Sequence, residues 1–185
     1  MMLIAGLGNP GVDYTGTRHN IGFTIIDRLV SSLDSGSRYS KFNSEAYNAS
    51  YAGKSLLIIK PLTFMNKSGA AVAAALAHYG EEGTGMLVVH DDIDIEFGRI
   101  KIKGGGSTAG HRGLQSIFEK TKRLDFDRLR FGVGRPPGRM EASDYVLRSF
   151  KNSEKQELDL LISRSVDMIK EYIENGLEQA ANKYN

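Results

Sequence analysis

The stretch Leu3-Ile4-Ala5-Gly6-Leu7-Gly8-Asn9-Pro10-Gly11 decides the fold of this 185-residue chain. Its first five residues form a short apolar run, which is typical of a buried β-strand, and the following Gly-Asn-Pro-Gly is a turn signal. The stretch also matches the G-x-G-x-x-G pattern, but a dinucleotide site requires a helix to begin directly at those glycines. Here Pro10, Gly11 and the polar residues 13–20 delay the next helix, so the pattern does not support a Rossmann nucleotide site.

Strand and helix patterns alternate along the rest of the chain. The spacing predicts strands over residues 3–7, 46–51, 55–59, 86–89, 99–103 and 128–133, and helices over residues 21–33, 67–79, 112–122 and 153–175. Asn66 is predicted to cap the second helix, Ser153 with Gln156 resembles a capping box, and the last residues are expected to form a short tail. We predict a single α/β domain over residues 1–185, with three layers and a mixed central β-sheet flanked by helices.

The composition excludes several classes of protein. Hydrophobic residues make up 41% of the chain and charged residues 25%, which is ordinary for a globular domain. The chain contains no cysteine, which excludes a disulfide scaffold, a thiol nucleophile and a thiolate metal site. No apolar run has the length of a membrane span, and the N-terminus lacks the pattern of a signal peptide. We therefore predict a cytoplasmic protein.

The small net charge of +2 hides a strongly basic segment. Residues 98–135 contain ten basic and three acidic side chains, so the rest of the chain is acidic overall. A local excess of this kind is typical of a surface that binds phosphate groups, although a solvated basic surface is the simpler alternative.

Four polar side chains stand at the ends of separate predicted elements. His19 follows the first strand and its long loop, Asp91 ends the strand at residues 86–89, Asn9 ends the first strand, and Asn66 precedes the alanine-rich helix. A histidine held by a carboxylate can activate water, and two amides can orient that water and polarise a carbonyl. Direct attack by water is favoured because the chain has neither a cysteine nor a G-x-S-x-G elbow. On spacing alone, a helix-capping role for His19 stays open.

The remaining candidates give weaker signals. Residues 92–96 resemble the start of an EF-hand loop, but Phe97 and Lys103 occupy the positions of the required glycine and glutamate. An acidic turn is therefore favoured over a metal site, and we predict neither metal nor cofactor. His90 is expected to point away from Asp91 if the strand continues, and His111 is a candidate to reach a ligand at the start of a helix.

The ordered motifs of this sequence resemble those of the bacterial-type peptidyl-tRNA hydrolases. The resemblance rests on GLGNPG at residues 6–11, TRHNIG at residues 17–22 after Tyr14, KPLTFMNKSG at residues 60–69, VHDDID at residues 89–94, GGGSTAGHRGL at residues 104–114 and RLRFGVG at residues 128–134. These blocks cover most of the chain at compatible separations, which makes the resemblance specific.

The resemblance implies an esterase that cleaves a peptide, or an N-blocked aminoacyl group, from the 3′-terminal ribose of tRNA and so recycles prematurely released tRNA. It implies that His19 is the general base, that Asp91 stabilises the charged histidine, and that Asn9 helps to distinguish N-blocked from free aminoacyl groups. The residues that it assigns to substrate and tRNA binding are Tyr14, Phe64, Met65 and Asn66 along one wall of a groove, His111 and Arg112 on the other, and Lys103 and Arg130 on acceptor-stem phosphates.

Arg112 departs from the family pattern, because many members have asparagine at this position. Arginine donates hydrogen bonds but cannot accept them, so an amide role does not transfer, and a contact to phosphate or to the substrate carbonyl is expected instead. Two alternatives stay open: a non-catalytic module that binds acceptor stems, and a hydrolase of small N-acyl esters. A monomer is the default expectation, since one cleft suffices for the chemistry.

Overall fold

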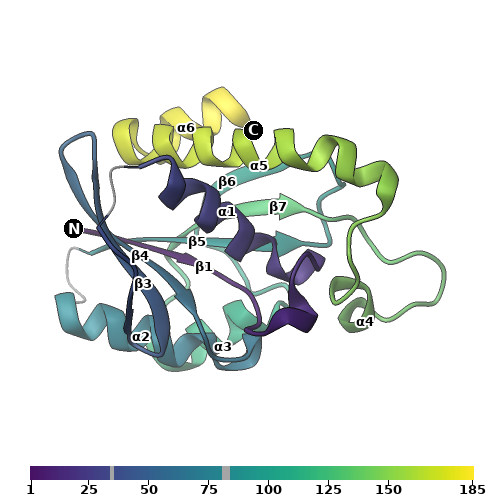
Figure 1. Cartoon of the computed structure of the whole chain (residues 1–185), viewed down its shortest axis with the longest axis horizontal. Coiled ribbons are helices and arrows are strands. Elements are labelled where there is room, and N and C mark those ends of the chain that lie inside the picture. Colours follow the sequence, from purple (N-terminus) through teal and green to yellow (C-terminus); the bar gives the residue numbers. More distant parts are fainter. Residues whose placement is uncertain (34–35, 81–83) are drawn as a thin grey trace.

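In the computed structural model, which describes residues 1–33, 36–80 and 84–185, a seven-stranded sheet is built around the buried strand β1 (Met2–Gly6). The strand order is β2-β3-β4-β1-β5-β7-β6, with parallel pairing from β4 through β1 and β5 to β7 and antiparallel pairing outside (Figure 1). The other strands are β2 (Tyr39–Lys41), β3 (Ser44–Tyr51), β4 (Lys54–Pro61), β5 (Gly85–Asp92), β6 (Ile100–Gly104) and β7 (Asp127–Gly132). The predicted mixed sheet is confirmed, and β6 is an edge strand as predicted.

Helices cover both faces of the sheet (Figure 1). One face carries α1 (Ile21–Ser31), α5 (Asn152–Asn175) and α6 (Leu177–Tyr184), and the other carries α2 (Ser68–Tyr79) and α3 (Arg112–Thr121). Side chains alternate between these faces along β1. Ile4 packs in the hydrophobic core under α1 and α5, and Leu3 and Ala5 pack in the core under α2 and α3. The predicted three-layer α/β domain is therefore confirmed. No helix among the described residues is long and apolar enough to cross a membrane.

Three local predictions about helix ends were wrong. Asn66 lies inside the short 3-10 helix η3 (Met65–Lys67), so it does not cap α2. The capping box predicted for Ser153 and Gln156 does not form, because α5 begins at Asn152. Instead, the carboxylate of Glu154 accepts a hydrogen bond from the Lys151 N–H at 2.5 Å. The expected tail is α6, which packs on α5 and β6.

Two glycines allow α1 to approach the sheet closely. A Cβ on Gly22 would lie 2.6 Å from the carbonyl oxygen of Val89, and a Cβ on Gly6 would lie 2.6 Å from that of Gly22. Without these side chains, the start of α1 and the preceding turn η2 (Arg18–Asn20) lie across the carboxyl ends of β1 and β5. This close packing brings His19 to the end of β5.

The same kind of contact between α2 and α3 generates a prediction about stability. A Cβ on Gly69 would lie 1.9 Å from the backbone oxygen of Ser116, so Gly69→Ala forces the two helices apart. We expect the variant to lose about 1–3 kcal/mol of unfolding free energy, measured by urea denaturation. Gly85→Ala is the matched control, since nothing lies within 4 Å of its Cβ position. Equal stability of the two variants would contradict this account of the helix contact.

Candidate active site

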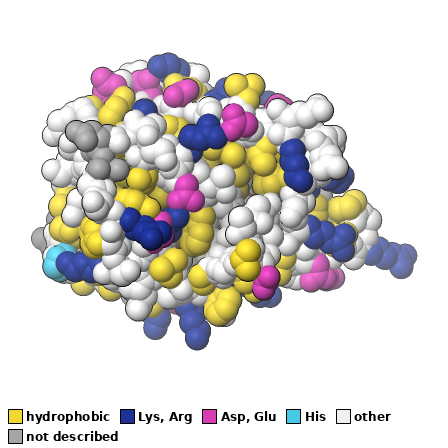
Figure 2. Space-filling model, in the orientation of Figure 1, with side chains coloured by type: hydrophobic (Ala, Val, Ile, Leu, Met, Phe, Trp, Pro, Cys, Tyr) yellow, Lys and Arg dark blue, Asp and Glu magenta, His cyan; other side chains and the backbone are white. Residues whose placement is uncertain are grey.

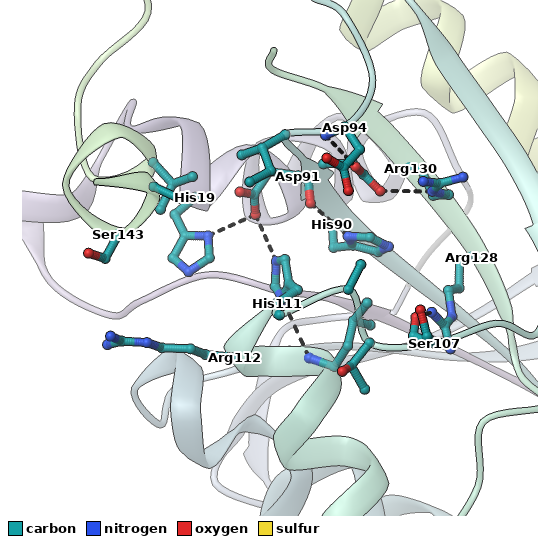
Figure 3. Close-up of a pocket in the computed structure, with 18 of the residues that line it drawn as sticks. His19, His90, Asp91, Asp94, Ser107, His111, Arg112, Arg128, Arg130 and Ser143 are labelled. Atoms are coloured by element: carbon teal, nitrogen blue, oxygen red, sulfur yellow. Dashed lines mark hydrogen bonds and ion pairs between the residues drawn. The ribbon is translucent and has the colours of Figure 1, made fainter. Parts of the chain in front are cut away.

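A pocket of about 290 Å³ lies at the carboxyl ends of the central strands (Figure 3). It is bounded by the end of β5, by β6 and β7, by the glycine-rich loop at residues 107–110 and the start of α3, and by the short helix α4 (Ala142–Val146). In an open α/β sheet this edge is where ligands bind. Six predicted site residues line it: His19, Asp91, Lys103, His111, Arg112 and Arg130.

The carboxylate of Asp91 is the centre of the pocket floor. It is only 2% exposed, and its Oδ1 accepts hydrogen bonds from His19 Nδ1 at 2.8 Å and from His111 Nε2 at 2.9 Å (Figure 3). Burial by itself would raise the pKa of Asp91, but the two histidines outweigh it and hold that pKa well below its usual range. Asp91 is therefore a carboxylate at neutral pH.

The contacts of His111 determine where its proton lies. Its Nδ1 accepts from the backbone N–H groups of Gly113 at 3.2 Å and Leu114 at 3.4 Å, which are unpaired donors at the start of α3. The ring proton is therefore on Nε2, where it is donated to Asp91. Because both nitrogens of His111 are occupied, this side chain cannot take a proton from water without losing these contacts.

His19 has the complementary arrangement. Its Nδ1–H is donated to Asp91, and among the described residues its Nε2 makes no hydrogen bond, although the ring lines the pocket. A neutral imidazole with this tautomer has a free lone pair on Nε2, which can accept a proton from water. The nearby carboxylate stabilises the imidazolium that results.

Three hydrogen bonds fix the position of Asn9. The amide of Asn20 accepts from Asn9 N–H at 2.8 Å and donates to its carbonyl at 2.9 Å, and Asn9 Oδ1 accepts from Met65 N–H at 2.7 Å. In the part of the chain that the structure describes, Asn9 Nδ2 has no partner. The amide of Asn9, three residues after the end of β1, therefore presents a donor and not an acceptor.

The three residues of the floor also have the spacing of a metal site. The ligand atoms of His19, Asp91 and His111 lie within 4.8 Å of one another, as a two-histidine, one-carboxylate site requires. However, ligation through His111 Nε2 would move the ring proton to Nδ1, which would then face two backbone N–H donors. The start of α3 therefore favours a hydrogen-bonded cluster over a metal centre.

The acidic turn after β5 is neutralised by arginines. Asp92 pairs with Arg130 at 2.8 Å, and Asp94 pairs with Arg135 at 2.6 Å. These ion pairs agree with the interpretation of the segment as an acidic turn.

The end of the pocket away from α4 is cationic. Lys103, Arg128 and Arg130 line it, and among the described residues the ammonium of Lys103 makes no ion pair or hydrogen bond. Arg128 is 3% exposed and donates to the carbonyls of Gly106 and Ser107, each at 2.5 Å, so it supports the loop that leads to His111. On the face drawn in Figure 2, by contrast, basic and acidic side chains are mixed.

His90 lies beneath the cluster. Its Nδ1 donates to the backbone oxygen of Asp91 at 2.7 Å, and its ring centre is 5.0 Å from that of His111. Although the strand continues past it, as β5, His90 lines the same pocket as Asp91. Burial lowers the pKa of His90 to about 3, and the neighbouring His111 contributes to the shift. His90 is therefore neutral at physiological pH.

Comparison with known proteins identifies the family. The chain matches the family model described as peptidyl-tRNA hydrolase over residues 3–185. Peptidyl-tRNA hydrolases of Frankia casuarinae and Rhodococcus erythropolis are 43% and 40% identical to it, each over 98% of this chain and over 92% and 96% of their own lengths. A crystal structure of peptidyl-tRNA hydrolase from Acinetobacter baumannii matches with a TM-score of 0.91 and 31% identity, covering 99% of this chain and 93% of that one. The chain belongs to the peptidyl-tRNA hydrolase family.

Membership of the peptidyl-tRNA hydrolase family establishes the activity. The protein is an ester hydrolase that acts on peptidyl-tRNA, and the predicted family and function are confirmed. This assignment leaves no reason to retain the alternatives of a non-catalytic acceptor-stem module or a hydrolase of small esters.

The hydrolase does not bring every predicted side chain into the pocket. Asn9 accepts from Met65 N–H and lines a second pocket together with Asn20 and Lys60. Tyr14 and Phe64 form an edge-to-face ring pair, with centres 6.2 Å apart, and line neither pocket. Asn66 is exposed.

Sequence reasoning about the hydrolase also missed three buried side chains next to predicted ones. These are Arg18, Asn20 and Arg128. The first two stand within the TRHNIG motif, and the third belongs to the basic segment.

The buried imidazole of His90 makes stability depend on pH. The unfolded chain binds a proton below the ordinary histidine pKa of 6.5, and the folded hydrolase does so only near pH 3. The unfolding free energy should therefore fall with pH from about 6.5 downward, by at most about 1.4 kcal/mol per pH unit from this group. Urea denaturation as a function of pH should show a smaller fall in His90→Asn than in the wild type. His78→Asn, at an exposed position, is the control, and an unchanged slope in His90→Asn would refute the assignment.

Proposed function

We propose that His19 is the general base for hydrolysis of the peptidyl-tRNA ester. Its free Nε2 is the observation that carries the proposal, because of the two histidines bound to Asp91 only His19 has, within the described residues, an imidazole nitrogen without a hydrogen-bond partner. In the first step, water attacks the ester carbonyl carbon and His19 Nε2 takes its proton. In the second, the bond between the carbonyl carbon and the ribose oxygen breaks, and the histidine returns the proton to that ribose oxygen. The products are the peptide acid and free tRNA.

Asp91 and Asn9 have different roles in this proposal. The carboxylate of Asp91 keeps the His19 proton on Nδ1 and stabilises the imidazolium. The Nδ2 of Asn9, whose orientation follows from the contact between its Oδ1 and Met65 N–H, donates to the ester carbonyl as negative charge develops there. A donor that is already oriented contributes without reorganising during the reaction.

The groove residues outside the pocket are proposed to hold the peptide and the terminal adenosine. Phe64 is 54% exposed and its ring meets Tyr14, which leaves an aromatic surface on which a base can stack. Asn66 is exposed next to Phe64, and Met65, whose side chain is buried, connects this surface to Asn9 through its backbone N–H. His111 and Arg112 form the opposite wall, where the cationic Arg112 meets phosphate or the substrate carbonyl.

The cationic end of the pocket is proposed to bind acceptor-stem phosphates through Lys103 and Arg130. Contacts of this kind position tRNA without reading its sequence, as an enzyme that serves many tRNAs requires. Arg130 is already paired with Asp92, whereas Lys103 carries an unpaired charge within the described residues. Because tRNA is used in the cytoplasm and a single chain supplies all these groups, we propose a cytoplasmic monomer.

The role of His19 is tested by following peptide release from N-acetyl-aminoacyl-tRNA. His19→Ala should lower kcat by about 10²–10⁴-fold, the range expected for loss of a general base, with little change in KM. His78→Ala should retain full activity, because His78 is exposed on α2 outside the pocket. Wild-type turnover by the His19 variant would overturn the assignment.

The role of the cations is tested through the salt dependence of KM. Lys103→Ala should reduce the slope of log KM against log salt concentration by about one for every tRNA tested. Arg130→Ala should reduce it less, because Asp92 already neutralises that side chain. Lys155→Ala, at an exposed position on α5, should leave the slope unchanged. A tRNA-specific effect, or no effect of Lys103→Ala, would count against phosphate binding here.

A further inference from the structure

Arg18, the neighbour of His19, is a buried arginine whose two terminal guanidinium nitrogens are both hydrogen-bonded. It is 2% exposed, and its guanidinium donates to the carbonyl of Arg148 at 3.2 Å, to that of Ser149 at 2.5 Å and to Glu154 Oε2 at 2.7 Å. Its Cζ lies 4.4 Å from the ring centre of Tyr145. A buried arginine is costly unless its donors are paired, so these contacts are a strong structural constraint.

The contacts join two segments that are far apart in the sequence. Besides the guanidinium bonds, Arg18 N–H donates to the Arg148 carbonyl at 3.1 Å, and Thr17 pairs with Ser149 as an isolated antiparallel bridge. The joined segment directly follows α4, of which Ala142, Ser143 and Val146 line the pocket. Ser143 lies beside His19 at the end of the pocket opposite Arg128 and Arg130 (Figure 3).

Loss of the Arg18 guanidinium should affect α4 more than His19. The imidazole of His19 has its own anchor on Asp91, which belongs to β5 of the central sheet. The α4 segment has one further side-chain hydrogen bond to the sheet region, from Tyr145 OH to the Val133 carbonyl at 2.8 Å. Within the described residues, Arg18 and Tyr145 are thus the two side chains whose hydrogen bonds hold this wall, in addition to the backbone contacts of residues 17–18 with residues 148–149.

We propose that Arg18 is a positioning residue that holds α4 against His19 and thereby fixes the width of the acyl end of the pocket. This inference rests on the proposed function, which puts the ester at His19 and the tRNA phosphates at the cationic end. The groove outside the pocket is proposed to hold the rest of the peptide, so the acyl side chain next to the ester is left with the end at α4, whose lining side chains are small or apolar. Arg18 contributes to the selection of the acyl group without touching it.

Arg18→Lys tests the proposal, because Nη1 of the guanidinium donates to both carbonyls while Nη2 donates to Glu154, and the single ammonium of lysine cannot reproduce this fork. We expect KM for N-acetyl-phenylalanyl-tRNA to rise about 3- to 10-fold, as for the loss of one or two hydrogen bonds, with kcat per folded enzyme unchanged. The ratio of kcat/KM between N-acetyl-phenylalanyl-tRNA and N-acetyl-glycyl-tRNA should also shift, since the wall that contacts the acyl side chain has moved.

Glu154→Gln is the matched control. A neutral amide still accepts from the guanidinium and leaves both carbonyl contacts in place, so KM and the substrate ratio should stay at the wild-type values. Tyr145→Phe is the second variant, because it removes the other polar attachment of α4 while keeping the ring beside Arg18. It should also raise KM for N-acetyl-phenylalanyl-tRNA. If Arg18→Lys does not fold, the KM of Tyr145→Phe tests the proposal instead.

Two results would overturn the proposal. One is a lower melting temperature in Arg18→Lys with unchanged KM and substrate ratio, which would make Arg18 a purely structural residue. The other is an unchanged KM in Tyr145→Phe. Neither depends on kcat of His19→Ala, so a failure of the proposed base is recognised separately.

Discussion

The buried carboxylate of Asp91 is the interaction on which the rest of the site depends. A carboxylate that is 2% exposed is costly to bury unless strong donors surround it. Two imidazoles from separate loops satisfy the same oxygen, one from the turn before α1 and one from the start of α3. The glycines that let α1 approach the sheet, and the arginine that supports the glycine-rich loop, both serve to bring these loops to Asp91.

The start of α3 gives the two histidines different roles. Its unpaired N–H groups bind His111 Nδ1 and keep the ring proton on the Asp91 side. His19 receives no such contact within the described residues, so its outer nitrogen stays free. The same N–H groups disfavour metal ligation by a cluster that otherwise has suitable spacing. A helix terminus thus separates two chemically similar residues into a support and a proposed base.

Much of the fold follows from patterns that act locally. The apolar runs at residues 3–7 and 86–89, the strands at residues 46–51 and 55–59 and the helical spacing from Ile21 onward are all confirmed. Errors fell on short elements and helix ends. The helices α4 and α6 are stabilised by packing on other elements, and the position of Asn66 depends on the chain entering α2 through a 3-10 turn, which propensity alone does not reveal.

The sequence by itself determined the layered fold, the family motifs and the identity of the polar side chains at the strand ends, because periodicity and motif spacing are properties of neighbouring residues. Only the tertiary structure decided that His19 and His111 share one oxygen, that Asn20 holds the backbone of Asn9, and that Arg18 joins residues 148–149 to the turn of His19. These contacts link residues from 11 to 131 positions apart or depend on ring tautomers. Such contacts depend on hydrogen-bond direction and on burial, and both are defined only after the chain has folded.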